Sequence, residues 1–193
     1  MKTLLFNPFE KYSEKTLIIF GLIFSALGCL LAFCFNARFD GAIDMHFVET
    51  VSLYEIVTDQ IINIFCLSLL LFITARYINR KARLIDILCT VTIARIPFYL
   101  LTFSNINNYF YKISMRMVEN VQPASMRDPD ILDLSIILVF GMFTILFLVW
   151  FFVLLWNGFK VSCNAKGTKH ALLFTADIIL AEVLSKTIIY FIS

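Results

Sequence analysis

Residues 134–159 read LSIILVFGMFTILFLVWFFVLLWNGF and contain no charged side chain. An α-helix rises about 1.5 Å per residue, and the hydrocarbon core of a bilayer is about 30 Å thick, so about 20 apolar residues are enough to cross it. The stretch meets this requirement with residues to spare. It predicts a membrane-spanning helix over about residues 134–156.

The rest of the chain is also unusually apolar. Of its 193 residues, 60% are hydrophobic and only 16% are charged, and the mean hydropathy is +0.85. An average soluble domain is about 45–50% apolar and about 25% charged. A globule of this size leaves roughly a quarter to a third of its chain surface in water, which is too much for such a composition. The composition excludes a soluble enzyme, a secreted disulfide scaffold and a disordered tail.

Several stretches satisfy the length that a membrane span requires. The first of them, residues 16–35, is longer than the apolar core of a signal peptide, and no cleavage motif follows it, so we expect it to remain as a helix. The fold class is therefore predicted to be all-α, a polytopic membrane protein with five transmembrane helices in a single domain, 1–193. The five spans are expected at about residues 16–35, 60–77, 84–103, 134–156 and 171–192.

The distribution of basic residues predicts the orientation. Ten Lys and Arg residues fall on the side of the N-terminus and four on the opposite side, whose loops are rich in Asp and Glu. Cytoplasmic loops carry the Lys and Arg excess, so we expect a cytoplasmic N-terminus and a C-terminus outside. The ten are Lys2, Lys11, Lys15, Arg76, Arg80, Lys81, Arg83, Lys160, Lys166 and Lys169, and the four are Arg38, Lys112, Arg116 and Arg127.

Two segments outside the spans are predicted to lie along the membrane surface. Asn7 and Pro8 are typical of a helix start, which predicts an interfacial helix over about residues 7–15. Apolar residues recur at helical spacing in the second segment, which suits another interfacial helix. These residues are Phe110, Ile113, Met117 and Val121. Asp128, Pro129, Asp130 and Asp133 then predict a turn and a helix cap.

Four ionisable residues fall inside two of the expected spans, residues 84–103 and 171–192. Such groups cost roughly 2.5–3.5 kcal/mol each on insertion scales, so they are candidates for function. Arg95 and Glu182 each lie eleven residues into parallel spans, about 16 Å deep, which predicts a direct ion pair. Lys186 follows Glu182 by four residues and is expected to share its carboxylate. Asp177 points to a different side of the same helix and needs another partner or a proton.

Two interpretations of these charges remain open. They form either a structural lock between the third and fifth spans or a path for protons or ions through the bundle. Pro97 removes a backbone donor and predicts a kink just beyond Arg95. A kink beside a central charge occurs at transporter sites and also in helices without such a role.

A basic cluster adjoins the second and third spans, and an acidic cluster lies in the first outer loop. The basic one is either the determinant of orientation or a contact for anionic lipid headgroups. It comprises Arg76, Arg80, Lys81 and Arg83. The acidic one matches no established metal-ligand spacing. It comprises Asp40, Asp44, His46 and Glu49.

The chain shows no catalytic or phosphate-binding motif, so no cofactor and no metal are expected. A formal charge of +2 argues against a nucleic-acid partner. Four of the five cysteines lie within apolar stretches and are expected to be packing residues. We therefore expect a protein that is not an enzyme, since the paired nucleophile and base that such chemistry needs are missing.

Short motifs in the chain resemble those of the Yip family (Ypt-interacting proteins, which share the Yip-one domain), in its small prokaryotic type. Residues 156–161 (WNGFKV) and 165–167 (AKG) resemble the exit from the fourth span, and residues 94–97 (ARIP) resemble the third span. The five spans and the Asn-Pro-Phe start at residues 7–9 agree with this. The long N-terminal region and the Asp-Leu-Tyr-Gly-Pro motif of eukaryotic members are not present, which argues against a Rab-type GTPase partner.

The resemblance implies a non-enzymatic integral membrane protein that organises membranes, assists trafficking or acts as an adaptor. It also implies a multi-pass location in a bacterial cytoplasmic (inner) membrane. The expected partners are the lipid bilayer, with anionic lipid, other membrane proteins or further copies of the chain. The alternative is a small transporter or channel subunit that uses Arg95, Asp177, Glu182 and Lys186.

Overall fold

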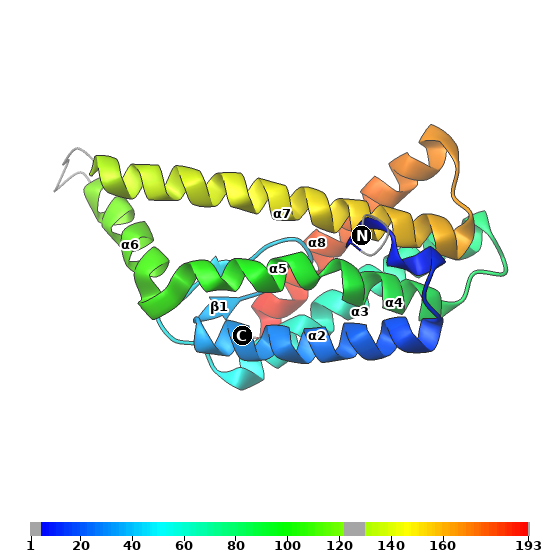
Figure 1. Ribbon diagram of the computed structural model, residues 1–193, viewed down its shortest axis with the longest axis horizontal. Coiled ribbons are helices and arrows are strands. Elements are labelled where there is room, and N and C mark those ends of the chain that lie inside the picture. The colour runs from blue at the N-terminus through cyan, green and yellow to red at the C-terminus, as the bar shows by residue number, and fades with distance from the viewer. Residues whose placement is uncertain (1–4, 122–129, 193) are drawn as a thin grey trace.

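The structure is a computed structural model that describes residues 5–121 and 130–192. It is a bundle of helices elongated along one axis (Figure 1). A two-residue antiparallel pairing of β1 (Ala37–Arg38) with β2 (His46–Phe47) interrupts the loop between the first two long helices. The long-axis elements are α2 (Glu14–Cys34), α3 (Leu53–Ile78), α4 (Leu84–Ala94), α5 (Ile96–Leu101), α7 (Ile131–Cys163) and α8 (Gly167–Ile192).

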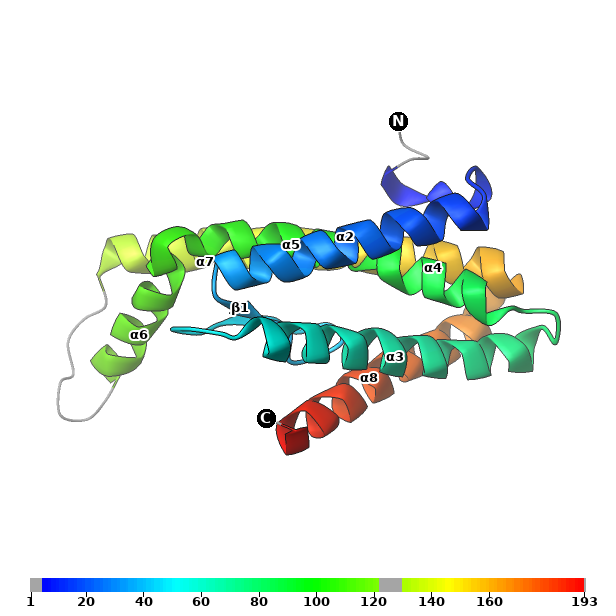
Figure 2. The same ribbon diagram turned by 90° about the horizontal axis from the view of Figure 1, so that it is seen from below.

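The helices form two layers. α2, the α4–α5 pair and α7 lie side by side, with α4 and α5 between the other two (Figure 1). α3 lies beneath them, and α8 packs against α3 at an oblique angle (Figure 2). The fully buried side chains of the core include Ile56 and Leu71 of α3, Val91 of α4, and Phe151 and Leu155 of α7.

The all-helical membrane fold predicted from composition is confirmed. Among the described residues, four helical stretches are long and apolar enough to cross a membrane. α8 is long enough but carries Asp177, Glu182 and Lys186 within its apolar run, so the five-span count and the outside C-terminus stay predictions. The four are Glu14–Cys34, Leu53–Ile78, Leu84–Glu119 and Ile131–Cys163.

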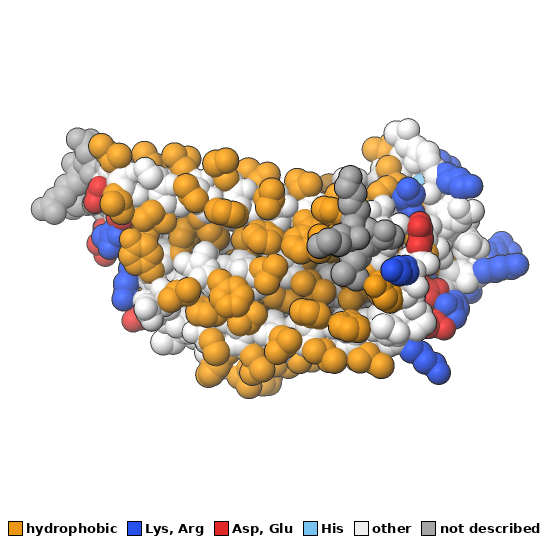
Figure 3. Space-filling model, in the orientation of Figure 1, with side chains coloured by type: hydrophobic (Ala, Val, Ile, Leu, Met, Phe, Trp, Pro, Cys, Tyr) orange, Lys and Arg blue, Asp and Glu red, His pale blue; other side chains and the backbone are white. Residues whose placement is uncertain are grey.

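The surface divides along the long axis. Hydrophobic side chains cover the middle of the face in Figure 3, while Lys and Arg gather at the end where the α3–α4 and α7–α8 turns lie. Large apolar residues such as Ile145 and Leu146 of α7 are more than 60% exposed, at 64% and 62%. An apolar belt between two polar ends is the surface that a bilayer requires.

Local capping sets the helix ends and moves several of them away from the expected bounds. Ser52 and Glu55 form a reciprocal capping box, so α3 begins seven residues before the expected start at residue 60. Asp130 caps α7 through its contact with the Leu132 amide, while Asp128 and Pro129 lie outside the described residues. α7 ends at Cys163, and the C-cap residue Asn164 adopts a left-handed conformation with φ 56°.

The expected helix over residues 7–15 is not formed as such. Only a single 3-10 turn, η1 (Pro8–Glu10), is present, Asn7 makes no capping hydrogen bond, and α2 begins at Glu14 under a Ser13 cap. Side chains of α7 hold the segment that precedes the turn. Trp150 Nε1 donates to the Leu5 carbonyl at 2.7 Å, and Asn157 Nδ2 donates to the Phe6 carbonyl at 2.8 Å.

The second predicted surface helix is present as α6 (Tyr109–Val121), which follows the 3-10 segment η2 (Thr102–Asn108). Its apolar side packs against the bundle. Ile113 is fully buried, and the Phe110 ring lies 4.1 Å from the Phe140 ring of α7, centroid to centroid. Arg116 and Asp133 join α6 to α7 through a 2.6 Å ion pair.

Glycines allow close approach of the helices in the layer of α2, α4, α5 and α7. A Cβ atom at Gly28 of α2 would lie 2.4 Å from Cδ1 of Tyr99 in α5, and one at Gly158 of α7 would lie 2.4 Å from Cγ2 of Thr90 in α4. Small residues at such crossings let membrane helices pack by van der Waals contact.

Replacing Gly28 by alanine should destabilise the bundle. We expect Gly28→Ala to lower the free energy of unfolding by about 1–3 kcal/mol, because the added methyl group overpacks the contact with Tyr99. Gly141→Ala is the matched control, because nothing lies within 4 Å of a Cβ atom there. Thermal unfolding in detergent checks this, and equal melting temperatures for the two variants would contradict it.

Candidate functional site

The loop between α2 and α3 (residues 35–52, here the α2–α3 loop) enters the helix bundle. Phe39 and Ala42 of this loop are fully buried. Asn63 Nδ2 of α3 donates to the Phe39 carbonyl at 2.7 Å, and the Ala42 amide donates to Ser185 Oγ of α8 at 3.1 Å. Polar side chains from two helices therefore satisfy backbone groups that have left water.

Arg95 is the centre of this arrangement. Its side chain is 1% exposed, and it donates from Nη1 to the Ala42 carbonyl at 2.7 Å and from Nη2 to Gln60 Oε1 at 3.1 Å. The guanidinium carbon also lies 5.6 Å from the centre of the Phe39 ring and 5.9 Å from that of Phe98. The charge is thus held by a backbone carbonyl, a side-chain amide and two aromatic rings.

The direct ion pair expected between Arg95 and Glu182 is not formed, and that expectation was wrong. The α2–α3 loop lies between them, because Glu182 Oε2 accepts from the Ile43 amide at 2.8 Å while Arg95 binds the preceding carbonyl. A Cβ atom at Gly41 would lie 2.4 Å from Glu182 Oε1. Glycine at this position lets the loop approach the carboxylate without displacing the Glu182 side chain.

The other two charges of the predicted network, Lys186 and Asp177, lie apart from Arg95. Lys186 lies 3.2 Å from Glu182 Oε1, in the expected i, i+4 relation, and also pairs with Asp44 of the loop. Asp177 lies further toward the start of α8, beside Thr74 of α3. Its Oδ2 atom is buried and has no hydrogen-bond partner within the described part of the chain.

The α4–α5 break places the arginine. α4 ends at Ala94 and α5 begins at Ile96, so the helix is interrupted at Arg95, two residues before Pro97. Pro97 lacks the amide that would continue the ladder. The Phe98 amide instead donates to the Arg95 carbonyl at 3.0 Å.

Several residues of this site were not predicted from the sequence. Gln60, Asn63 and Ser185 are uncharged, so they carry no signal of the kind that an intramembrane charge gives. Gln60 and Asn63 stand three residues apart and share one side of α3, which is the pattern that a search for buried polar faces detects. Asp59 beside them is 2% exposed and pairs with Arg38 of the loop at 2.7 Å.

Asparagines secure the loop to η2. Asn36 Nδ2 donates to Asn108 Oδ1 at 2.9 Å, and Asn105 Nδ2 donates to the Phe35 carbonyl at 2.7 Å. Asn108 Nδ2 in turn donates to the Glu49 carbonyl at 3.2 Å. Both ends of the α2–α3 loop are thereby fastened to the segment that follows α5.

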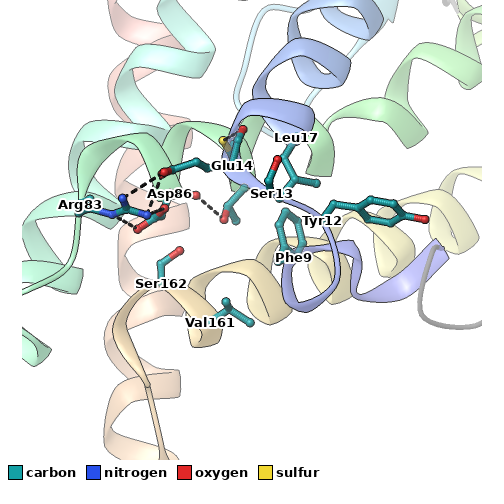
Figure 4. A pocket seen from close by; sticks show the side chains of 11 residues that line it. Phe9, Tyr12, Ser13, Glu14, Leu17, Arg83, Asp86, Val161 and Ser162 are labelled. Atoms are coloured by element: carbon teal, nitrogen blue, oxygen red, sulfur yellow. Dashed lines mark hydrogen bonds and ion pairs between the residues drawn. The ribbon is translucent and has the colours of Figure 1, made fainter.

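The basic cluster at the opposite end of the bundle divides into paired and free residues. Arg83 lies 2.7 Å from Glu14 Oε2 and 2.8 Å from Asp86 Oδ1, beside a cavity of about 420 Å³ (Figure 4). Arg76 donates to the Arg80 carbonyl. The side chains of Arg80 and Lys81 are exposed and have no partner among the described residues.

The comparisons with known proteins assign a family. The family model of the Yip1 domain matches residues 2–185. The chain belongs to the Yip1 domain family. The resemblance deduced from its short motifs is thus confirmed, while neither the curated proteins nor the solved structures include a match.

The acidic cluster of this Yip1 domain contains a histidine and a carboxylate that shift each other's pKa. His46 Nδ1 lies 3.1 Å from Asp40 Oδ1. This contact raises the pKa of His46 above its usual value against the opposing effect of burial. Burial alone raises the pKa of Asp40, but its contact with His46 and the charges of His46 and Lys186 outweigh this and lower it. In the described parts of the chain, no three His, Cys, Asp or Glu side chains are grouped to hold a metal ion.

The His46–Asp40 pair predicts a pH dependence. With the pKa of His46 raised and that of Asp40 lowered, the pair stabilises the Yip1 domain fully between about pH 3.9 and about pH 6.5. This stabilisation is lost as pH rises through the raised pKa of His46, and as pH falls through the lowered pKa of Asp40. NMR titration in detergent should give His46 a pKa above about 6.5 in the unchanged chain and near it in Asp40→Asn. An identical pKa in both proteins would rule out the pair.

The Arg38–Asp59 pair predicts a large effect on stability. Arg38→Gln leaves the Asp59 carboxylate buried without its ionic partner, which should cost about 3–5 kcal/mol of unfolding free energy. Adding Asp59→Leu removes the stranded charge and should restore much of the loss. The control is Arg80→Gln at the exposed turn, expected within about 0.5 kcal/mol of the unchanged protein. Chemical denaturation of the unchanged protein and the three variants tests the pair, and a double variant as unstable as Arg38→Gln would argue against it.

Proposed function

We propose that this Yip1 domain protein is a non-enzymatic integral membrane protein that acts through contacts with lipid, with other helices or with partner proteins. Its role would be membrane organisation, trafficking or that of an adaptor, in a multi-pass arrangement in a bacterial cytoplasmic membrane. The observation that carries the proposal is what the charged side chains of the predicted spans bind. Arg95 and Glu182 hold the backbone of the α2–α3 loop.

A structural role for these charges follows from their partners. A transported ion or proton needs groups that exchange partners along an open path. Both terminal nitrogens of Arg95 are committed to protein acceptors, and the side chain is 1% exposed. Glu182 is likewise bound by the Ile43 amide and by Lys186. Removing either side chain would leave buried backbone groups unpaired, so folding alone accounts for both.

The surface supports a role in contacts. Apolar side chains cover the middle of the face in Figure 3, and exposed apolar residues lie on α2, α7 and α8, such as Leu22 at 58%, Met142 at 73% and Val183 at 60%. Lipid or a neighbouring helix, including one from another copy of the chain, covers such a surface in a membrane. Arg80 and Lys81 are the part of the basic turn that is free to contact anionic headgroups, at about 1 kcal/mol per charge.

One observation favours the second candidate, a small transporter or channel subunit. Asp177 is 8% exposed and retains a buried, unpartnered carboxylate oxygen, which is the kind of group that a proton carrier uses. Asp177 lies beside Thr74 of α3, whereas Arg95 binds Gln60 and the α2–α3 loop and Glu182 and Lys186 bind that loop and each other. A proton path would therefore depend on Asp177 and not on the loop-binding charges.

Proton flux and stability separate the two functions. In liposomes with a pH gradient, the unchanged protein and Asp177→Asn should show no flux above empty liposomes. Arg95→Met should lower the free energy of unfolding by about 1–3 kcal/mol, because the buried Ala42 carbonyl loses its donor. Arg80→Met, at an exposed arginine, is the matched control and should leave stability unchanged. Flux through the unchanged protein that Asp177→Asn abolishes would overturn the proposal and establish the transporter.

A further inference from the structure

Two cavities adjoin one another beneath the N-terminal segment. The polar cavity, of about 420 Å³, lies between the starts of α2 and α4 and the end of α7 (Figure 4). The apolar cavity, of about 390 Å³, lies along α2 and is bordered by α5 and the middle of α7. Tyr12 and Leu17 line both cavities. The two cavities therefore lie next to each other, with Tyr12 and Leu17 as a common border, and form the polar half and the apolar half of one region.

The apolar half is built to receive a hydrocarbon chain. Its walls include Phe20 and Phe24 of α2, Ile96 of α5 and Leu154 of α7. Phe20 is 52% exposed and Phe24 is 37% exposed, so this wall reaches the apolar outer surface of the bundle. An acyl chain can enter it from the bilayer without crossing a polar barrier.

The polar half carries both signs of charge in one small space. Arg83 lies between Glu14 and Asp86, 2.7 Å from the first carboxylate and 2.8 Å from the second. These residues stand at the starts of α2 and α4, at the basic end of the bundle where headgroups would lie. A carboxylate has about four acceptor sites, so the two ion pairs leave each carboxylate able to bind a further donor.

We propose that this site binds one aminophospholipid of the phosphatidylethanolamine class. The primary ammonium group binds Glu14 and Asp86, the phosphodiester binds Arg83, and one acyl chain fills the apolar cavity. Two carboxylates and one guanidinium leave an excess negative charge that disfavours an anionic headgroup. This inference rests on the proposed function and gives its lipid contact a chemical identity.

The N-terminal segment closes the site from the headgroup side. Leu5 and Pro8 line the apolar cavity and Phe9 lines the polar one. Trp150 and Asn157 hold the backbone just before the turn. This segment therefore lies over a bound lipid at the point where headgroup and acyl chain meet.

Headgroup competition tests the site on the intact protein. Native mass spectrometry in micelles with equal amounts of phosphatidylethanolamine, phosphatidylcholine and phosphatidylglycerol of the same chains should show phosphatidylethanolamine retained about tenfold over the other two. A primary ammonium donates charge-assisted hydrogen bonds to carboxylates, and a choline group has no N–H to donate. Glu14→Gln with Asp86→Asn should reduce the preference over phosphatidylcholine to about one, while Glu10→Gln, at an exposed carboxylate of η1, should leave it unchanged.

A second variant tests the acyl half without touching a charge. Thr16→Phe adds a ring to the wall of the apolar cavity and should lower retention of phosphatidylethanolamine about tenfold. Equal retention of the three lipids by the unchanged protein overturns the inference, as does an effect of Glu10→Gln equal to that of the double variant. Retention of phosphatidylglycerol that is lost in Arg80→Gln with Lys81→Gln overturns it in favour of the basic turn. None of these outcomes bears on the proton-flux test, so the two proposals fail separately.

Discussion

A loop that enters a membrane bundle must have its backbone amides and carbonyls bound by protein, because lipid supplies no hydrogen-bond partners. The α2–α3 loop meets this constraint at Phe39, Ala42 and Ile43 through side chains of α3, of the break between α4 and α5, and of α8. Three helices are therefore joined through one segment of backbone. Charged side chains are costly to place in a membrane, and in this arrangement they hold the bundle together.

The same constraint accounts for the unusual features around the loop. The helix break at Arg95 lies at the point where the guanidinium reaches the Ala42 carbonyl. Gly41 lets the loop approach Glu182. Asn105 and Asn108 fasten the loop ends to η2. A helix break and buried asparagine side chains are unfavourable in a membrane unless their polar groups are bound, and here the α2–α3 loop binds them.

The two ends of the bundle are built differently. At the end that holds the α2–α3 loop, polar side chains form hydrogen bonds with one another and with the loop backbone. At the opposite end, Arg83 and its two carboxylates border an open cavity that lies next to an apolar one. The loop-binding contacts and the proposed lipid site are thus separated along the length of the bundle, so the proposed lipid contact could vary without loss of the fold.

The sequence by itself determined the all-helical membrane fold, the approximate positions of four helical stretches apolar enough to cross a membrane, and the family. Hydropathy and length are properties of local stretches such as residues 134–156, so no knowledge of packing is needed to read them. Equal depth on two helices, by contrast, does not specify which way two side chains face or what lies between them. Only the tertiary structure decided that Arg95 and Glu182 meet the α2–α3 loop and not each other, because the path of that loop depends on contacts from helices distant in the chain.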